Sequence, residues 1–428
     1  MLRRNSLLIG LFILLSMNWQ PLNAQIRTSS PYSRYGLGDI MGSRLSRSLA
    51  IGGTAYAMRD NLMINIQNPA SYTAFDSLSF LAEIGLSSNF NQLQTSTNVQ
   101  KFNNLTSLGY ITFGFPVTRW MGMSAGLVPY SQTGYKLIVN DSAAGIGNVT
   151  QKYEGYGNLN RFYLGSGFKL YRDLSVGFNA SFLFGTLNNV RSAYFDDLTY
   201  VFHTRMRNSL IINDFHLEAG LQYHHSFNDE HYLNAGLTYQ LPFDVRGRRT
   251  NVVERFVTST TGLESTRDTV EYLKNQGGNI NMPGGLGGGL VFGKKNYWMV
   301  GADVAWQNWG AYTSFGEKDS LTSSLRASAG MMIVPRHSSV SNYFRKITYR
   351  AGFRYEDTYL ELKGHRISEY AVTAGFGFPF RKTGSSVNIA LEVGQRGTTR
   401  DGLIKETFVR GVLGLSIKEF WFFRRKLD

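Results

Sequence analysis

The chain contains no cysteine, only 9 prolines and, beyond its first residues, no long apolar run. The absence of cysteine excludes a disulfide framework, a thiolate metal site, a thiol nucleophile and a lipid-modified N-terminal cysteine. A membrane-spanning helix needs about 20 apolar residues, and the chain beyond its N-terminus offers no such stretch. Glycine (46) and aromatic residues (14%) are abundant instead, which favours strands over helices. We therefore predict an all-β protein.

The N-terminus predicts export. Arg3 and Arg4 precede an apolar run at 7–17, and mostly small or polar residues follow up to Ala24, which is the pattern of a secretory signal peptide. The run is too short to cross a bilayer as a helix. We expect residues 1–24 to be removed on passage through the inner membrane, so that the exported chain is either soluble or an outer-membrane barrel.

The basic excess bears on the partners. The net charge of +14 usually suggests nucleic acid, but export makes that partner improbable, and we predict no nucleic acid. We expect outer-membrane lipid and lipopolysaccharide phosphates instead. Arg246, Arg248 and Arg249 stand in the longest predicted outer loop and are candidates for those phosphates, with a solvated loop as the alternative.

Apolar residues alternate with small or polar ones in segment after segment from about residue 78 onward, which is the period of a strand with two different faces. In the clearest segment, Leu174, Val176 and Phe178 share one face, and Ser175 and Gly177 share the other. The segments with this pattern, 14 in all, are 78–90, 103–116, 120–131, 158–170, 174–186, 208–226, 230–242, 282–293, 296–308, 323–334, 347–356, 367–379, 387–396 and 407–418.

The length of these segments suits a membrane barrel. A tilted strand needs about 9 to 11 residues to cross a bilayer, whereas strands of soluble proteins average about 5 to 6. The first connections alternate between long and short: 91–102, 117–119, 132–157, 171–173, 187–207, 227–229, 243–281 and 294–295. Outer-membrane barrels have short periplasmic turns and long outer loops. We predict a 14-stranded antiparallel transmembrane β-barrel over 77–420, with both termini and a short tail at 421–428 in the periplasm.

A large soluble sandwich or propeller is the alternative, but it would not keep one face apolar on every long strand. If the apolar face contacts lipid, the alternate face contacts the lumen, where charges avoid a cost of several kcal/mol near the bilayer centre. The predicted lumen-facing charges are Glu83, Arg161, Lys169, Asp214, Glu218, Asp303, Arg326, Arg350, Arg354, Glu369, Glu392 and Arg410. Such a lumen is either a water-filled pore or a wall that binds a plug.

Residues 25–76 are the candidate plug. They lack strand alternation, carry glycine, asparagine and charges, and include apolar residues such as Tyr56 and Ile64. This moderate hydrophobicity argues against simple disorder. We predict that residues 25–76 fold as an N-terminal plug, or hatch, in the lumen.

Three short motifs stand in this segment. They comprise Gly52, Gly53, Thr54 and Ala55, then Arg59, Asp60 and Asn61, then Asn68, Pro69 and Ala70. In this order they resemble the N-terminal region of the FadL-type outer-membrane transporters. The resemblance implies a 14-stranded barrel whose N-terminal hatch blocks the lumen, and inward transport of long-chain fatty acids or other hydrophobic compounds. Ser71 stands where many members have glycine, and the family's ligand-contacting residues are not recognisable, so substrate identity does not transfer.

The run Ser-Pro-Tyr-Ser-Arg-Tyr-Gly at 30–36 resembles the opening of exported barrels of Bacteroidota-type bacteria, and the ending at 419–422 is similar. Related barrels of these bacteria also serve as accessory subunits of protein secretion or outer-membrane assembly machines and transport nothing themselves. The resemblance therefore implies envelope protein partners as an alternative to transport.

Catalytic and metal sites are not indicated. The glycine-rich run at 283–289 is not followed by Gly-Lys-Ser/Thr and enters a strand, so we interpret it as small lumen-facing residues that leave room for the plug. Asp214, His216 and Glu218 share one strand face, which is compatible with a metal but is more often a polar lumen wall. No Gly-x-Ser-x-Gly motif or Ser, His and Asp/Glu set stands out. We expect no enzyme activity, no cofactor and no metal.

The leading functional hypothesis is an outer-membrane channel in which the plug rearranges to admit a hydrophobic small molecule. The alternatives are a non-transporting accessory barrel of an outer-membrane secretion or assembly complex, and a general porin for hydrophilic solutes. A kink in the wall would favour the channel, because a strand interruption opens a lateral exit in the FadL-type fold. Pro129 is the candidate for that kink, since proline removes a hydrogen bond from the strand ladder.

Overall fold

The structure is a computed structural model. It describes residues 30–42, 45–103, 107–143, 147–195, 201–259, 261–335, 343–380 and 384–421. The predicted signal peptide and all but the first residue of the predicted tail lie outside the described residues. Within the described ranges, no helix is long and apolar enough to cross a membrane.

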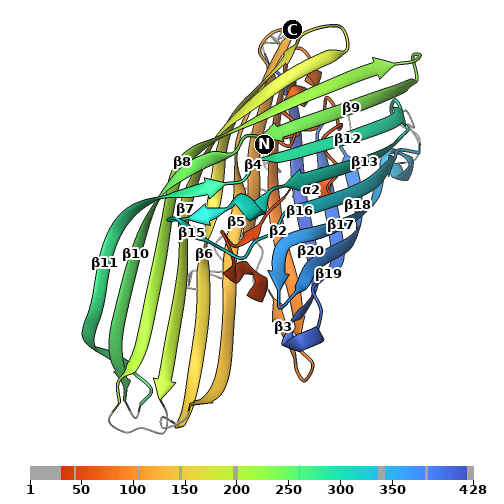
Figure 1. The fold of residues 1–428 in the computed structure, drawn as a ribbon. Coiled ribbons are helices and arrows are strands. Elements are labelled where there is room, and N and C mark those ends of the chain that lie inside the picture. The colour runs from red at the N-terminus through yellow and green to blue at the C-terminus, as the bar shows by residue number, and fades with distance from the viewer. Residues whose placement is uncertain are drawn as a thin grey trace, which may run out of the picture.

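The wall is a closed barrel of 14 antiparallel strands, which Figure 1 shows from the side. It closes where β2 (Ser79–Gln94) pairs with β20 (Lys405–Phe420). The other wall strands are β4 (Ser107–Pro116), β5 (Met121–Ala143), β6 (Gly147–Lys169), β7 (Leu174–Phe195), β8 (His203–Ser226), β9 (His231–Gln240), β12 (Gly285–Lys294), β13 (Trp298–Gln307), β16 (Ser324–Ile333), β17 (Thr348–Leu362), β18 (His365–Pro379) and β19 (Ser386–Arg396). The predicted fold class is confirmed, and each predicted strand segment overlaps one of these strands.

The remaining elements lie at the outer end or in the connections between the wall strands. They are β3 (Val99–Asn103), β10 (Phe243–Thr258), β11 (Glu264–Met282), β14 (Thr313–Ser314), β15 (Glu317–Lys318) and the 3-10 helices η3 (Trp309–Ala311), η4 (Tyr343–Lys346) and η5 (Arg400–Gly402). β10 continues the line of β9 along β8, and β11 pairs with β10.

Several predicted outer loops are wrong, because strands occupy most of them. The described parts of 132–157 and 187–207 continue β5, β6, β7 and β8, and 243–281 holds the β10–β11 hairpin. Residues 91–102 likewise include the end of β2 and most of β3. In Figure 1 the extended strands form the tall curved sheet at the lower left. On β11 the alternation that marks a strand is lost, because both faces of residues 264–277 are exposed, although the backbone ladder continues.

One face of the wall is apolar and exposed on almost every strand. Phe178, Leu217 and Val372 expose more than half of their surface, while the intervening Gly177, Asn179 and Thr373 are buried. Such a band is the surface that lipid covers in an outer-membrane barrel. The fold and this band support a location in the outer membrane, where barrels have their tight turns on the periplasmic side.

The N-terminal segment, residues 30–76, packs against the opposite face of the wall. It contains η1 (Pro31–Arg34), β1 (Asp39–Ile40), α2 (Ser46–Leu49) and η2 (Pro69–Ala74). Apolar side chains of this segment form three buried clusters with wall residues. In one of them, Ile64 and Tyr72 of the segment pack with Leu81, Tyr163 and Val412 of the wall. The core of the protein therefore lies between this segment and the barrel.

Candidate functional site: the contact between the N-terminal segment and the wall

The glycine motif of the segment forms a tight turn after α2. Gly52 and Gly53 both have positive φ, +74° and +85°, a conformation that favours glycine. The backbone N–H of Gly52 donates to Oγ1 of Thr373 on β18 at 2.8 Å. Gly352 on β17 approaches the same turn, since a Cβ there would lie 2.3 Å from the Gly52 nitrogen. The turn and the wall meet backbone to backbone.

Asp303 of β13 binds the backbone that follows this turn. Its Oδ2 accepts hydrogen bonds from the backbone N–H of Ala55 at 2.6 Å and of Tyr56 at 2.9 Å. Nη2 of Arg326 on β16 donates to the Tyr56 hydroxyl at 2.9 Å. Two of the predicted lumen-facing charges therefore contact the N-terminal segment directly.

The Asn-Pro-Ala motif begins η2 and ties it to the wall. Asn68 caps η2, because its Oδ1 accepts from the backbone N–H of Ala70 at 3.2 Å, and Pro69 occupies the first turn, where its missing N–H costs nothing. The Asn68 amide also donates to the carbonyl of Tyr56 at 2.7 Å and to that of Leu221 on β8 at 3.1 Å. The buried asparagine thus joins two parts of the segment and one wall strand.

Arg59 and Asp60 have a more local role. Nη1 of Arg59 donates to Oγ1 of Thr73 at 2.8 Å, and burial lowers the pKa of Arg59 to about 10. Asp60 accepts from the backbone N–H of Leu62 at 2.9 Å. These two residues of the motif stabilise turns within the segment, and the hydrogen bonds recorded for them do not reach the wall.

A cluster of buried ion pairs lies on neighbouring strands β17 to β20. Nη2 of Arg354 lies 2.5 Å from Oε1 of Glu369 and 2.7 Å from Oε1 of Glu392. Nη1 of Arg410 lies 3.2 Å from Oε1 of Glu369 and 3.1 Å from Oε2 of Glu392. The strand register causes this, because Glu392 stands opposite Arg410. The structure thus brings four of the predicted lumen-facing charges together.

The cluster extends to residues that the sequence interpretation missed. Arg396 donates from Nε to Oε2 of Glu369 at 2.5 Å and from Nη2 to Oδ1 of Asp39 in the N-terminal segment at 2.8 Å. The hydroxyl of Ser30 donates to Oε1 of Glu406 at 2.5 Å. Arg396 lies on the same strand face as the predicted Glu392, and Glu406 lies on the same face as the predicted Arg410. Extending the alternation to the ends of β19 and β20 would therefore have identified both. No local signal marks Asp39.

A second ion pair joins Arg161 and Glu218. Nη1 of Arg161 lies 2.9 Å from Oε1 of Glu218, and Nε2 of His216 lies 3.2 Å from the same oxygen. The row that contains Asp214, His216 and Glu218 therefore holds an arginine partner. Across the described residues there is no group of three His, Cys, Asp or Glu side chains that suits a metal.

The remaining predicted charges occupy different surroundings. Glu83 is buried and accepts from the backbone N–H of Ile64 at 3.3 Å, and Arg350 donates to an asparagine on β19 at 3.2 Å. Asp214 on β8 is paired with Arg246 of β10, whose Nε lies 3.3 Å from Oδ2 of Asp214. Lys169 is exposed near the periplasmic end.

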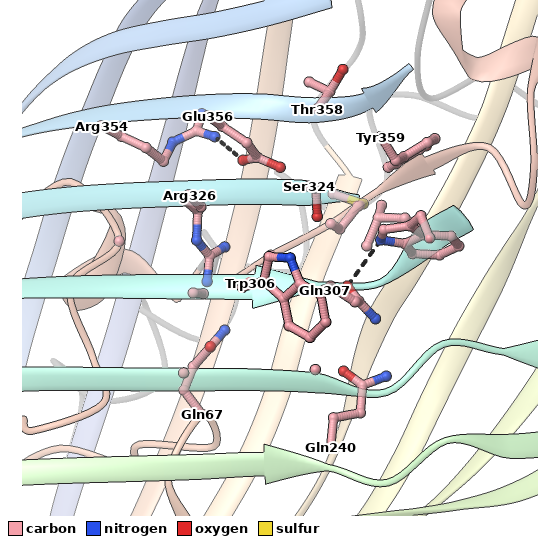
Figure 2. A pocket seen from close by; sticks show the side chains of 18 of the residues that line it. Gln67, Gln240, Trp306, Gln307, Ser324, Arg326, Arg354, Glu356, Thr358 and Tyr359 are labelled. Carbon is pink, nitrogen blue, oxygen red and sulfur yellow. Dashed lines mark hydrogen bonds and ion pairs between the residues drawn. The ribbon is translucent and has the colours of Figure 1, made fainter. Parts of the chain in front are cut away.

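A cavity of about 210 Å³, lined by charged as well as apolar residues, remains between the segment and the wall. Arg326, Arg354 and Glu356 line it from neighbouring strands, together with Gln67 of the segment and Gln240 of β9. Figure 2 shows Arg326 and Gln67 pointing toward one another across this space. The lining contains charges of both signs at short spacing, a surface that suits water or polar groups.

The wall is interrupted beside Pro129. The β4–β5 ladder ends at Leu127, and the register of β5 against β6 shifts between Pro129 and Ser131. Beyond the shift, Ile40 of β1 pairs with Ser131, so the N-terminal segment occupies the edge of β5 there. A cavity of about 40 Å³ behind this place is lined by apolar residues such as Leu45, Leu49 and Val128, and also by Arg161 and Arg410.

Comparisons with solved structures find the same fold in two toluene transporters and a FadL homologue. The Pseudomonas putida toluene transporter TodX matches with a TM-score of 0.58 and 17% identity over 90% of this chain and 100% of that one. A Pseudomonas aeruginosa FadL homologue matches with 0.58 and 12% over 90% and 100%, and the Ralstonia pickettii toluene transporter TbuX with 0.56 and 14% over 89% and 98%. At these identities the likeness establishes the FadL-type fold, as the resemblance implied.

Comparison with protein families and curated proteins gives one further result. No curated protein matches the chain. The model of the family described as BamG matches residues 1–428, the whole sequence. The resemblance of the opening motif to barrels of Bacteroidota-type bacteria stays a prediction.

Proposed function

The chain belongs to the BamG family, and on that premise we propose that it is a closed accessory barrel of an outer-membrane protein assembly complex. In this proposal the N-terminal segment is a plug that stays in the lumen, and the barrel contributes surfaces to its partners instead of a transport path. The resemblances left two roles open, transport and an accessory role with envelope protein partners. Membership of this family favours the accessory role.

The observation that carries the proposal is the close packing of the segment backbone against the wall, together with the charged hydrogen bonds that join the two. Glycines on many strands leave room for the segment backbone, and a Cβ at Gly236 would lie 1.9 Å from the Tyr56 carbonyl oxygen. Asp303 and Arg396 bind the segment with charged groups from separate strands. Hydrogen bonds to charged groups are each worth about 1.5–3 kcal/mol. Removing the segment would break many of these bonds at once.

The chemistry of the larger cavity supports the same conclusion. A passage for hydrocarbons needs an apolar lining, whereas the cavity presents guanidinium and carboxylate groups such as Arg354 and Glu356. At the outer end, Trp309, Tyr312 and Tyr359 pack with Tyr32 and Leu37 of the segment in a buried cluster. Ions and hydrocarbons would both meet a barrier, so this closure argues against a general porin as well.

A disulfide between the segment and the wall tests the proposal. Ile40 and Ser131 are paired residues of β1 and β5, and cross-strand partners have Cα separations of about 4.5–5.5 Å, which suit a disulfide. The chain has no native cysteine, so Ile40→Cys with Ser131→Cys forms only the intended bridge. The two single variants are the matched controls, and added reductant releases the bridge.

The two functions predict opposite results for the bridged protein. An accessory barrel needs no movement of the segment, so assembly of other outer-membrane proteins in cells with the bridged variant should equal that of the single variants. Loss of that assembly with restoration by reductant would contradict a permanently closed barrel. Stoichiometric protein partners should also remain with the bridged barrel when it is purified in mild detergent.

Uptake of a hydrophobic small molecule is the second candidate, and the interrupted wall beside Pro129 favours it. The gap between β4 and β5 would become a lateral exit if β1 left the edge of β5, and the small cavity, which Val128 and Pro129 help to line, lies beside it. Toluene is a suitable probe, because solved proteins of this fold are described as toluene transporters. Toluene entry that the bridge abolishes and reductant restores would establish the channel, whereas equal entry in bridged and unbridged cells would exclude it.

A further inference from the structure

The periplasmic turns repeat a pair of residue types. Four turns place an exposed basic side chain within two residues of an exposed aromatic one. The pairs are Arg119 with Trp120, Tyr171 with Arg172, Lys295 with Tyr297, and Phe344 with Arg345. The aromatic side chains expose 54, 72, 44 and 71% of their surface, respectively. We call these four turns the periplasmic rim.

The basic residues of the periplasmic rim have no acidic partner. Some other cations near the ends of the wall are paired, for example Lys294 with Glu230 at 2.8 Å and Arg249 with Glu317 at 3.6 Å. None of the four rim cations forms an ion pair with any residue in the described ranges. Their charge is therefore available to a group outside the chain.

The outer end differs in its charge pattern. On β11, Arg267 is followed by Asp268, and Glu271 stands close to Lys274, so charges of both signs are interleaved. Arg249, a predicted lipopolysaccharide contact, packs over the ring of Phe315 at 4.5 Å and is paired with Glu317. One outer pair, Tyr272 with Lys274 on β11, is similar but stands beside Glu271, whereas three of the four rim pairs have no acidic residue within two positions.

The placement of the four turns favours contact with lipid, which surrounds the barrel, over a protein partner, which would bind on one side. They connect β4 to β5, β6 to β7, β12 to β13 and β16 to β17, so they are distributed around the barrel instead of gathering on one side. Aromatic side chains of barrels lie at the headgroup level of the membrane. Basic side chains beside them reach the phosphate groups and are attracted to anionic lipids.

We infer that the periplasmic rim binds the phosphate groups of anionic phospholipids in the inner leaflet of the outer membrane. This inference is independent of the proposed function, because it applies to an accessory barrel and a channel alike. It also assigns part of the net charge of +14 to a defined surface. Each rim turn supplies one cation for a phosphate and one aromatic ring for the headgroup boundary.

Lipid selectivity of the full-length barrel in nanodiscs tests the inference. The membrane is phosphatidylcholine with spin-labelled phosphatidylglycerol or spin-labelled phosphatidylcholine, and electron paramagnetic resonance gives the preference of the barrel surface for the anionic lipid. The rim variant carries Arg119→Gln, Arg172→Gln, Lys295→Gln and Arg345→Gln. The control variant removes equal charge from the outer end by Arg248→Gln, Arg255→Gln, Arg267→Gln and Lys274→Gln.

We expect the preference for phosphatidylglycerol to fall about twofold or more in the rim variant and to stay near the native value in the control variant. Raising the salt concentration should weaken the native preference as well, because exposed charges are screened. An equal fall in both variants, or none in the rim variant, would overturn the inference. So would an unchanged lipid preference combined with loss of a co-purifying acidic periplasmic protein, which would identify a protein partner. Heat-modifiable migration on a gel verifies that both variants are folded.

Discussion

Replacing Gly352 with alanine should loosen the N-terminal segment from the wall. The added Cβ would lie 2.3 Å from the backbone nitrogen of Gly52 and 2.3 Å from the carbonyl carbon of Ile51. Carbon atoms in contact prefer about 3.5–4.0 Å, and backbone atoms cannot rotate away, so the turn must move by about 1 Å. Gly411 on β20 is the matched control, because a Cβ there has no neighbour within 4 Å.

The size of the effect follows from two contributions. Overpacking of a well-packed site costs about 1–3 kcal/mol. The movement also weakens the hydrogen bond from Gly52 to Thr373, at 2.8 Å, which is worth about 1 kcal/mol. The segment should therefore be destabilised against the wall by about 2–4 kcal/mol. Since about 1.4 kcal/mol corresponds to a factor of ten, the population of the opened segment should rise roughly 30-fold to several hundredfold.

A single reporter thiol measures this opening. Ala57 lies in the segment and is fully buried, and the chain has no other cysteine, so Ala57→Cys reacts with a maleimide only when the segment opens. We expect the labelling rate in isolated membranes to rise with Gly352→Ala and to be unchanged with Gly411→Ala. Equal slow labelling of the two variants would refute the argument that the glycine exists to admit the segment backbone.

Three further substitutions act on other contacts of the segment and the wall. Asp303→Asn removes the charge that two backbone N–H groups bind, so the reporter should label more quickly, by an amount equivalent to about 1–2 kcal/mol; an unchanged rate would mean that the charge is not needed. Arg354→Ala leaves Glu369 and Glu392 undercompensated and should lower the urea stability of the barrel by about 3–5 kcal/mol, with Arg354→Lys recovering only part because an ammonium cannot form the same bidentate contacts. Asn68→Ala removes a cap and two amide hydrogen bonds, equivalent to about 2–3 kcal/mol, so the reporter should label more quickly while heat-modifiable migration stays native; loss of that migration would show that the motif holds the barrel as well as the segment.

The membrane wall could be predicted from the sequence because its signal is local. A strand between lipid and lumen alternates residue by residue, and each wall strand carries that pattern in its own residues. The sheet at the outer end, which includes β10 and β11, was missed because prediction depended on that alternation. Where β11 is exposed on both faces, at residues 264–277, no difference between faces remains to be written into the sequence, although β11 still pairs with β10 along its length.

The candidate site was predictable in part. Alternation alone assigns Glu369, Glu392 and Arg410 to one face, and the structure finds them within one cluster. Their partners depend on register, and the register of β18, β19 and β20 is set by the closure of the whole barrel. Asp39 reaches Arg396 across 357 residues of sequence, a distance over which no local pattern carries information.

The all-β class, the strand number and the segregation of charge to one face of the wall were determined by the sequence itself. Each of these depends on whether a residue and its near neighbours in the sequence contact lipid, water or the lumen. The contacts of Gly52, Asp303 and Asn68, the pairing of β1 with β5 beside Pro129 and the arrangement of basic turns around the rim were decided only by the tertiary structure. They depend on which strands face each other once the sheet has closed, and that geometry belongs to the barrel as a whole.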